Sequence, residues 1–304
     1  MRKGLTMRSK LVATVCLFVL FFACTIQAGD VAQHLQDVSV TIKSGYSEGS
    51  GVIKTRIIDG KKINFVWTAA HVVDNLRNVE TVVTPDGATR KIVSFDDCSL
   101  VKELNEGGRR VGEMKMAAVV VRYSAKEDLA LLRIRKVDFI SASVDFYLDP
   151  NIPKIGTRLF HVGSLLGQAG SNSMTSGIVS QIGRVYSGIG KEEFDQTTVA
   201  AFPGSSGGGV YLEDGKYVGM LVRGAGETFN LIVPIRRMAR WARKANIEWA
   251  LDDNIQPPSM QELGKLPIED VGHEFTSKSE NTAAAKSKHP YLIRIQTQTK
   301  IDKQ

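Results

Sequence analysis

Cysteine is scarce in this chain of 304 residues, which contains only three. Cys16 and Cys24 lie in an apolar stretch near the amino terminus, so Cys98 is the one cysteine in the rest of the chain. A single cysteine cannot form an internal disulfide, and the hydrophobic core must therefore hold the fold. Paired Cys or His residues at the spacing of zinc ligands are also missing, and we expect neither a metal nor a cofactor.

A basic surface stripe is missing as well. The net charge is +7, but Arg2, Lys3, Arg8 and Lys10 supply four of these charges, which leaves about +3 beyond residue 28. No run of basic residues with interleaved aromatics follows, and this argues against a nucleic acid as partner.

The first 28 residues are typical of a targeting segment. Basic residues precede the apolar run Leu11–Ile26, and Ala28 offers a small residue at a cleavage point. We therefore predict a signal peptide over residues 1–28 and a secreted or periplasmic protein with no other membrane contact. An uncleaved membrane anchor is the alternative, because the run is near the lower length limit for a membrane span.

Short β-like runs separated by turn residues follow the targeting segment. Asp59–Lys62 separates two such runs, and Asn78–Phe95 is typical of a hairpin closed at Pro85-Asp86-Gly87. Many short strands with few helical periods predict an all-β barrel or sandwich.

Helical periodicity is clear in one segment, Pro234–Ala250. Pro234 suits a first helical turn, and the arginines and lysines should form a solvated face. The apolar positions that recur every three or four residues are Ile235, Met238, Ala242, Ala245 and Trp249. Residues 251–304 are polar and lack periodicity, so we expect a mostly disordered tail in which 291–301 could add an edge strand.

Three stretches carry residues suited to acyl transfer. "VWTAAHVV" places His71 after a strand, "KEDLALLRI" places Asp128 before one, and "PGSSGGGVY" places Ser206 in a glycine-rich turn. A serine hydroxyl needs a base to take its proton, and a neutral histidine oriented by a buried carboxylate provides one. The backbone N–H groups of Gly204 and Ser206 would stabilise the oxyanion, because small residues allow the turn to direct them to one point.

These motifs, in the order His, Asp, Ser, resemble the trypsin/chymotrypsin-like serine proteases, most closely the bacterial HtrA-type (Deg) peptidases. The stretch His161–Arg184 is also similar to those enzymes, and the resemblance covers roughly residues 36–250. It implies an all-β fold of two six-stranded antiparallel β-barrels with the triad in the cleft between them. We place the protease domain at 29–250, with barrels over 36–140 and 141–233 and a C-terminal helix over 234–250.

The chain departs from the family pattern at two places. Ser205 stands where digestive-type members carry an aspartate, so activation through an ion pair with a new amino terminus is not expected. The polar tail is too short and hydrophilic for the PDZ domain usual in HtrA-type enzymes. The long His71–Asp128 separation is assigned to an extended hairpin or loop at Cys98–Lys115.

The substrate pocket is predicted near Thr198–Phe202 and Leu221–Gly226. Ala200 and Ala201 offer no carboxylate, so we expect a small or medium apolar residue before the cleaved bond, with Phe202 or Arg223 narrowing the pocket. The predicted substrate-binding residues are Ala200, Phe202, Leu221, Val222, Arg223 and Gly224.

Other assignments remain open at this stage. His161 is a rival base, Asp138 and Asp145 are rival carboxylates, and Ser205 is a rival nucleophile. The expected activity is that of an endopeptidase acting on polypeptides through an acyl-enzyme. A catalytically silent barrel that binds proteins, or an acyl hydrolase acting on esters, is the alternative.

Overall fold

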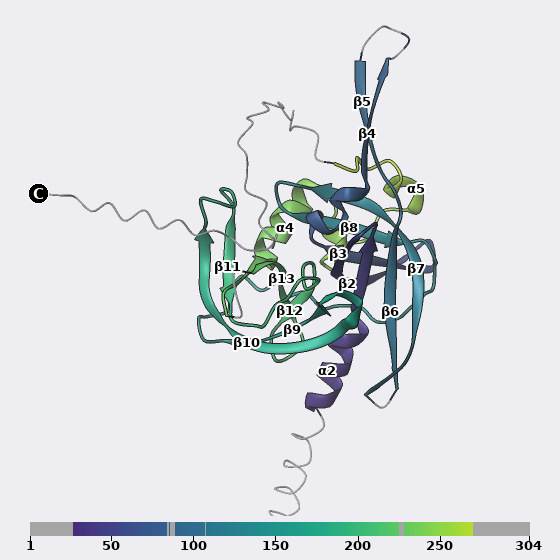
Figure 1. Ribbon diagram of the computed structural model, residues 1–304. Coiled ribbons are helices and arrows are strands. Elements are labelled where there is room, and N and C mark those ends of the chain that lie inside the picture. Colours follow the sequence, from purple (N-terminus) through teal and green to yellow (C-terminus); the bar gives the residue numbers. More distant parts are fainter. Residues whose placement is uncertain (1–26, 84, 86–88, 107, 225–227, 270–304) are drawn as a thin grey trace, which may run out of the picture.

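Two closed antiparallel β-barrels of six strands each lie side by side in the chain (Figure 1). The structure is a computed structural model that describes residues 27–269 except 84, 86–88, 107 and 225–227. The predicted all-β fold with two barrels and a C-terminal helix is confirmed. Most of the chain between Ser39 and Pro234 is used to build these barrels.

The first barrel has the strand order β1-β2-β3-β8-β7-β6. Between β2 and β3, Asp59 and Gly60 both have positive φ (50° and 74°), which is the backbone of a two-residue hairpin turn. The strands are β1 (Ser39–Ser44), β2 (Ser47–Ile58), β3 (Lys61–Thr68), β6 (Cys98–Glu106), β7 (Arg109–Ser124) and β8 (Leu129–Ile134).

The second barrel has the order β10-β11-β14-β13-β12-β9. Its inward side chains form a separate small core that includes Leu159, Val210 and Ile232. The strands are β9 (Arg158–Leu165), β10 (Gly170–Val185), β11 (Glu193–Thr197), β12 (Gly209–Tyr211), β13 (Tyr217–Gly224) and β14 (Asn230–Pro234).

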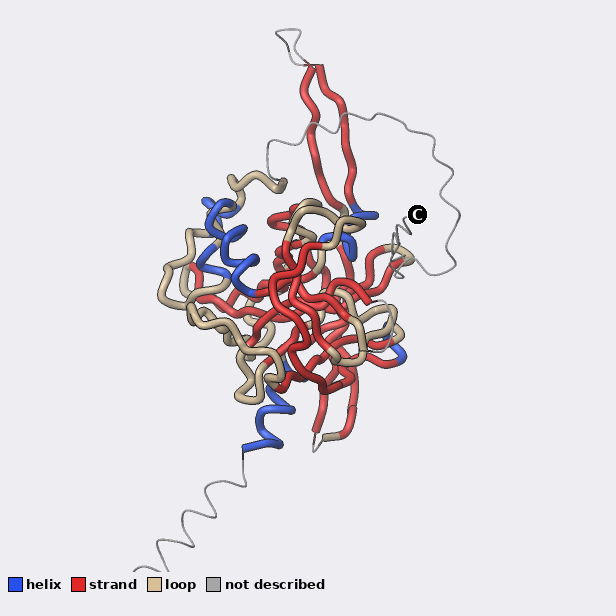
Figure 2. The backbone as a smooth tube through the Cα atoms, turned by 90° about the vertical axis from the view of Figure 1, so that its left-hand side faces the viewer, coloured by secondary structure: helices blue, strands red, loops and turns tan. Residues whose placement is uncertain are grey.

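Two long hairpins lie between His71 and Asp128. Strands β4 (Arg77–Val83) and β5 (Thr89–Phe95) pair as predicted and project from the body, as Figures 1 and 2 show. The turn residues 86–88 lie outside the described residues. Strands β6 and β7 form the second hairpin, so the segment Cys98–Lys115 is indeed an extended hairpin that continues into the first barrel.

Helix α4 (Ile235–Lys244) leaves the second barrel and packs on the first. The rings of Trp241 and Trp67 meet edge to face at 5.8 Å. The apolar positions predicted for this helix are buried, but the helix ends six residues earlier than the predicted Ala250. Asn246 adopts a left-handed φ of 56°, which ends the helix, and a short 3₁₀ turn η3 (Glu248–Ala250) follows.

The expectation of a disordered tail from residue 251 is wrong for residues 251–269. The Arg56 guanidinium, buried in the first barrel, donates to the carbonyls of Trp249, Asp252 and Ile255 at 2.7–2.8 Å. Helix α5 (Met260–Leu263) then starts at a capping box of Ser259 and Glu262. The predicted edge strand at 291–301 lies outside the described residues.

At the other end, helix α2 (Gln27–Asp37) packs Leu35 into the core and leads into β1. Ala28, the predicted cleavage point, lies in this helix, and the predicted signal segment before it is outside the described residues. Among the described helices, none combines the length and the apolar character needed to cross a bilayer.

Candidate active site

His71 lies at the start of the short helix α3 (Ala70–Val73), directly after β3. Ala69 and Ala70 are fully buried, and their small side chains let this turn sit close to the barrel. The His71 side chain remains about a quarter exposed, at 27%. The strand end therefore presents the imidazole at the surface of the first barrel.

Asp128 faces His71 from the turn between β7 and β8. Its Oδ1 and Oδ2 lie 2.9 and 3.0 Å from His71 Nδ1, and Oδ1 also accepts the His71 backbone N–H at 3.1 Å. Asp128 has a left-handed φ of 53°, a conformation that an aspartate tolerates better than most residues. The carboxylate thus fixes both the ring and the backbone of His71, and Nδ1 carries the proton.

Arg223 on β13 completes a three-residue charge cluster. Its Nη1 lies 3.2 Å from Asp128 Oδ2, 3.0 Å from His71 Nδ1 and 3.0 Å from the Val222 carbonyl. Because Nδ1 donates to Asp128, it cannot also accept from Arg223, so the guanidinium is held by the carboxylate and the carbonyl. Burial alone would raise the pKa of Asp128, but His71 and then Arg223 outweigh it and hold that pKa below its usual value.

Ser206 lies in the glycine-rich turn before β12. Gly204 and Gly207 have φ values of +94° and +87°, and a Cβ on either would lie within 2.3 Å of a backbone oxygen. Both positions therefore require glycine. Ser206 is partly exposed, whereas Ser205 is buried and its Oγ accepts from the Phe202 N–H at 3.1 Å.

Ser50 on β2 joins this turn to the first barrel, a role that the sequence analysis missed. Its N–H donates to the Ser206 carbonyl and its Oγ to the Gly204 carbonyl, both at 2.7 Å. The Oγ also accepts from the Ser164 N–H at 2.7 Å. The only local signal is the surrounding Gly-Ser-Gly, which is too common to identify such a contact.

The Ser206 turn contacts the first barrel next to the helix that carries His71. A Cβ built on Gly49 would lie 2.6 Å from the Val72 side chain and 3.2 Å from the Ser206 carbonyl, so this side chain and this carbonyl both lie next to Gly49. His71 Nε2 is buried and has no hydrogen-bond partner in the described part of the chain. The structure therefore pairs His71 with Asp128, and the described residues include no Ser206–His71 hydrogen bond.

The other predicted substrate-binding residues fall into two groups. Phe202 is 45% exposed and Ala200 is partly exposed, so both side chains can be reached from solvent. Leu221 and Val222 are buried in the core, so only their backbones can face a substrate. Arg223 points to Asp128, and the expectation that it narrows the predicted pocket finds no support in its contacts.

His161 lies in the second barrel beside Gly208, and within the described residues it forms no hydrogen bond with His71, Asp128 or Ser206. It is fully buried, and its Nδ1 donates to the Gly209 carbonyl at 2.9 Å. Burial lowers its pKa to about 4, more than the Gly209 carbonyl raises it. A histidine locked in this way is a structural residue.

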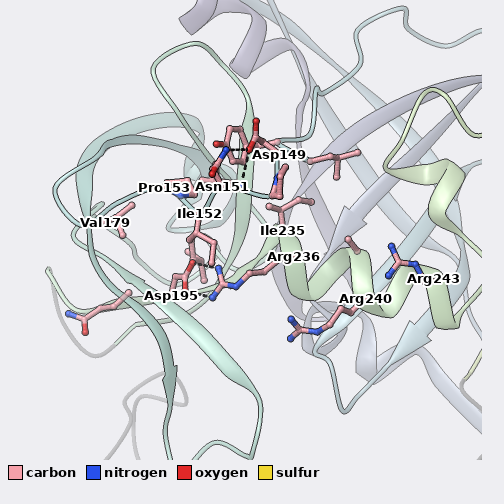
Figure 3. Close-up of a pocket in the computed structure, with 17 residues that line it drawn as sticks. Asp149, Asn151, Ile152, Pro153, Val179, Asp195, Ile235, Arg236, Arg240 and Arg243 are labelled. Atoms are coloured by element: carbon pink, nitrogen blue, oxygen red, sulfur yellow. Dashed lines mark hydrogen bonds and ion pairs between the residues drawn. The ribbon is translucent and has the colours of Figure 1, made fainter.

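A cavity of about 260 Å³ lies elsewhere, between residues 147–153 and helix α4 (Figure 3). Its main charges are already paired, because Arg236 forms two 2.7 Å hydrogen bonds with Asp195. It contains none of the predicted catalytic residues. Within the described residues, no three His, Cys, Asp or Glu side chains gather as a metal site.

Comparisons with known proteins show the family and the fold. The family described as "Trypsin-like peptidase domain" matches residues 49–220, more than half of the chain. A probable periplasmic serine endoprotease DegP-like from Halomonas elongata is 30% identical over 181 residues, which are 58% of this chain and 30% of that protein. The serine endoprotease DegS of Haemophilus influenzae is 34% identical over 112 residues, which are 34% of this chain and 30% of that protein. The chain thus spans under a third of both relatives.

Solved structures share the fold. The structure of Deg5 superposes with a TM-score of 0.53 and 19% identity, and the match covers 74% of this chain and 96% of that one. The serine endoprotease from Yersinia pestis gives a TM-score of 0.52 and 17% identity, over 72% and 66% of the two chains. From the matched family and the two-barrel fold together, the chain belongs to the trypsin-like peptidase domain family.

Proposed function

We propose that this chain is an exported serine endopeptidase whose triad is His71, Asp128 and Ser206. The observation that carries the proposal is the His71–Asp128 pair, with two contacts of 2.9 and 3.0 Å, beside the serine turn. A ring whose Nδ1–H is fixed by a carboxylate presents Nε2 as a proton acceptor. Nε2 is the buried nitrogen that lacks a partner, and a buried polar atom of this kind calls for one.

The reaction follows from these roles. Ser206 Oγ attacks the carbonyl carbon while its proton passes to His71 Nε2, and Asp128 stabilises the imidazolium. The oxyanion is bound by the N–H groups of Gly204 and Ser206, neither of which donates to another described residue. The C–N bond breaks, the amine takes the proton from His71, and water then hydrolyses the Ser206 ester by the same steps in reverse order.

The resting separation of Ser206 and His71 does not argue against this mechanism. Catalytic hydrogen bonds in substrate-free enzymes are often long and become short only when substrate binds. The ring is tied to Asp128 at Nδ1 and at the backbone, so the proposal requires the Ser206 side chain to move to the ring when substrate binds. The silent binding barrel stays the alternative, since the same missing bond would fit an inactive protein.

A fluorophosphonate probe separates these functions. The purified protein should be labelled, and Ser206→Ala should abolish the labelling while Ser205→Ala, the neighbouring control, keeps it. Casein and peptide cleavage should accompany the labelling, whereas ester hydrolysis alone would identify an acyl hydrolase. No labelling of a protein that unfolds cooperatively would favour the silent barrel.

The proposal has two further parts. We infer export from the basic and apolar residues of 1–28, and an amino-terminal sequence of the protein from cell fractions tests it. We also infer that the residue before the cleaved bond is small or medium and apolar, because Ala200 and Ala201 bring no charge to the pocket. A peptide library cleaved mainly after arginine or lysine would contradict that preference.

A further inference from the structure

A second cavity, of about 370 Å³, opens beside the carboxylate of the proposed triad. Its volume is in the range of ligand pockets, about 300–1,000 Å³. It differs from the cavity at helix α4 because two of its lining residues, Asp128 and Arg223, belong to the charge cluster at His71. The charged residues in its lining are Lys126, Asp128, Lys191, Glu192, Arg223 and Arg237.

Positive charge is in excess in this lining. Arg237 is not available to a ligand in the cavity, because its side chain is 2% exposed and its Nε donates to Glu127 at 2.9 Å. Lys126 lies 3.4 Å from Glu192. Lys191 is exposed and takes part in no ion pair within the described ranges. Arg223 shares Asp128 with His71, because the carboxylate Oδ2 lies 3.2 Å from Arg223 Nη1 and 3.0 Å from His71 Nδ1.

Strand β13 shows how a polypeptide would reach this cavity. Leu221 is bonded to the serine turn through Gly207 N–H and Gly208 C=O, at 2.8 and 3.0 Å. Beyond Leu221, the described part of β13 pairs only with β14, so its other edge is open to an extended chain. In the proposed binding mode, the acyl half of the substrate, which stays attached to Ser206 in the intermediate, lies along this edge and past Arg223.

We propose that the cavity binds an acidic side chain of the substrate, two to four residues on the amino-terminal side of the cleaved bond. This inference rests on the proposed peptidase function. Arg223 is the specificity-determining residue, and Lys191 supplies a second, unpaired charge. An incoming carboxylate would form a charge-assisted pair with the Arg223 guanidinium, which is 30% exposed and therefore accessible.

Matched fluorogenic peptides that differ only by Glu or Gln at one of these positions test the proposal. At one or more of them, the wild-type kcat/KM should be about tenfold higher for Glu than for Gln. Glu placed on the other side of the cleaved bond serves as the control and should give no such gain. In Arg223→Gln the Glu/Gln ratio should fall to near one, Arg223→Lys should keep part of it, and Lys191→Gln should lower it.

The ratio is measured within one protein preparation, so reduced folding of a variant cancels out. Arg158→Gln is the matched control, because Arg158 is 69% exposed on β9 and pairs with Glu213 outside the cavity. A ratio near one at all three positions in the wild type, or a ratio unchanged in Arg223→Gln, would overturn the acidic preference alone. A protein that neither cleaves any peptide nor reacts with the fluorophosphonate would instead overturn the peptidase function itself.

Discussion

His161 should make the stability of this protein depend on pH between 6.5 and 4. Its folded pKa of about 4 lies below the value of about 6.5 for an unfolded histidine, because the buried ring cannot easily carry a charge. Within this interval the unfolded chain binds a proton that the folded chain does not. Stability is therefore complete above pH 6.5 and is lost as pH falls toward 4.

The size of the effect follows from the two pKa values. At pH 5 the linkage relation gives a loss of about 2 kcal/mol, and the full shift corresponds to about 3 kcal/mol. At pH 5 most aspartates and glutamates stay ionised in both the folded and the unfolded state, so they contribute less than His161 to the loss of unfolding free energy. The ring also has no room to move: a Cβ on Gly208 would lie 2.7 Å from His161 Cε1.

Urea unfolding at pH 7.5 and pH 5.0, followed by fluorescence of the buried tryptophans, measures this loss. The Ser206→Ala background prevents self-cleavage during the experiment. In His161→Gln the amide N–H can still donate to the Gly209 carbonyl, but nothing titrates, so the variant should lose about 2 kcal/mol less than its parent over this interval. Equal losses in the two proteins, within about 0.5 kcal/mol, would refute the reasoning.

Three more perturbations test the site and the core. Asp128→Asn removes the negative charge and puts an NH2 donor beside His71 Nδ1, which favours the wrong tautomer of the ring; it should lower kcat by about 10⁴-fold on a peptide substrate, and a loss under tenfold would contradict the assigned role. Gly207→Ala places a Cβ 2.1 Å from the Ser50 carbonyl at φ +87°, so it should cost more than about 2 kcal/mol in urea unfolding. Gly60→Ala, with φ +74° but open space, should cost only about 1 kcal/mol, and equal costs would show that crowding is unimportant. Burial raises the pKa of Cys98 to about 12, so mass spectrometry should find this thiol unmodified by iodoacetamide at pH 8 until urea unfolds the chain.

Local sequence predicted an all-β fold and the segments that carry the site, whereas the two barrels were implied by the family resemblance. Alternating strands, the Asp-Gly turn and the apolar face of α4 depend on neighbours within a few residues. His71 and Asp128 could be chosen because each lies at the end of a strand, where a barrel fold brings loops together. Their 2.9 Å contact is the consequence of strand order and not of any single motif.

Long-range polar contacts were not predictable from local patterns. Residues 251–269 were expected to be disordered because their composition is polar. The residue that orders the first part of them is Arg56, nearly two hundred positions earlier and itself 7% exposed. Arg237 was likewise expected on a solvated helix face, yet it is buried against Glu127 and the Phe194 ring. The burial of a charged residue can be predicted only when its partner is known, and the partners of Arg56 and Arg237 are far away in the sequence.

Arg223 belongs to the proposed catalytic site. One carboxylate, that of Asp128, orients the ring of His71 and also holds the Arg223 guanidinium 3.0 Å from that ring. The imidazolium that must form during catalysis would therefore meet a like charge at close range in the resting protein. A substrate carboxylate that takes Arg223 into the cavity would remove this repulsion and leave Asp128 to the imidazolium alone. Under the proposed specificity, one movement of Arg223 would both recognise an acidic substrate and activate the base. The reason is that Arg223 and the imidazolium of His71 compete for the carboxylate of Asp128.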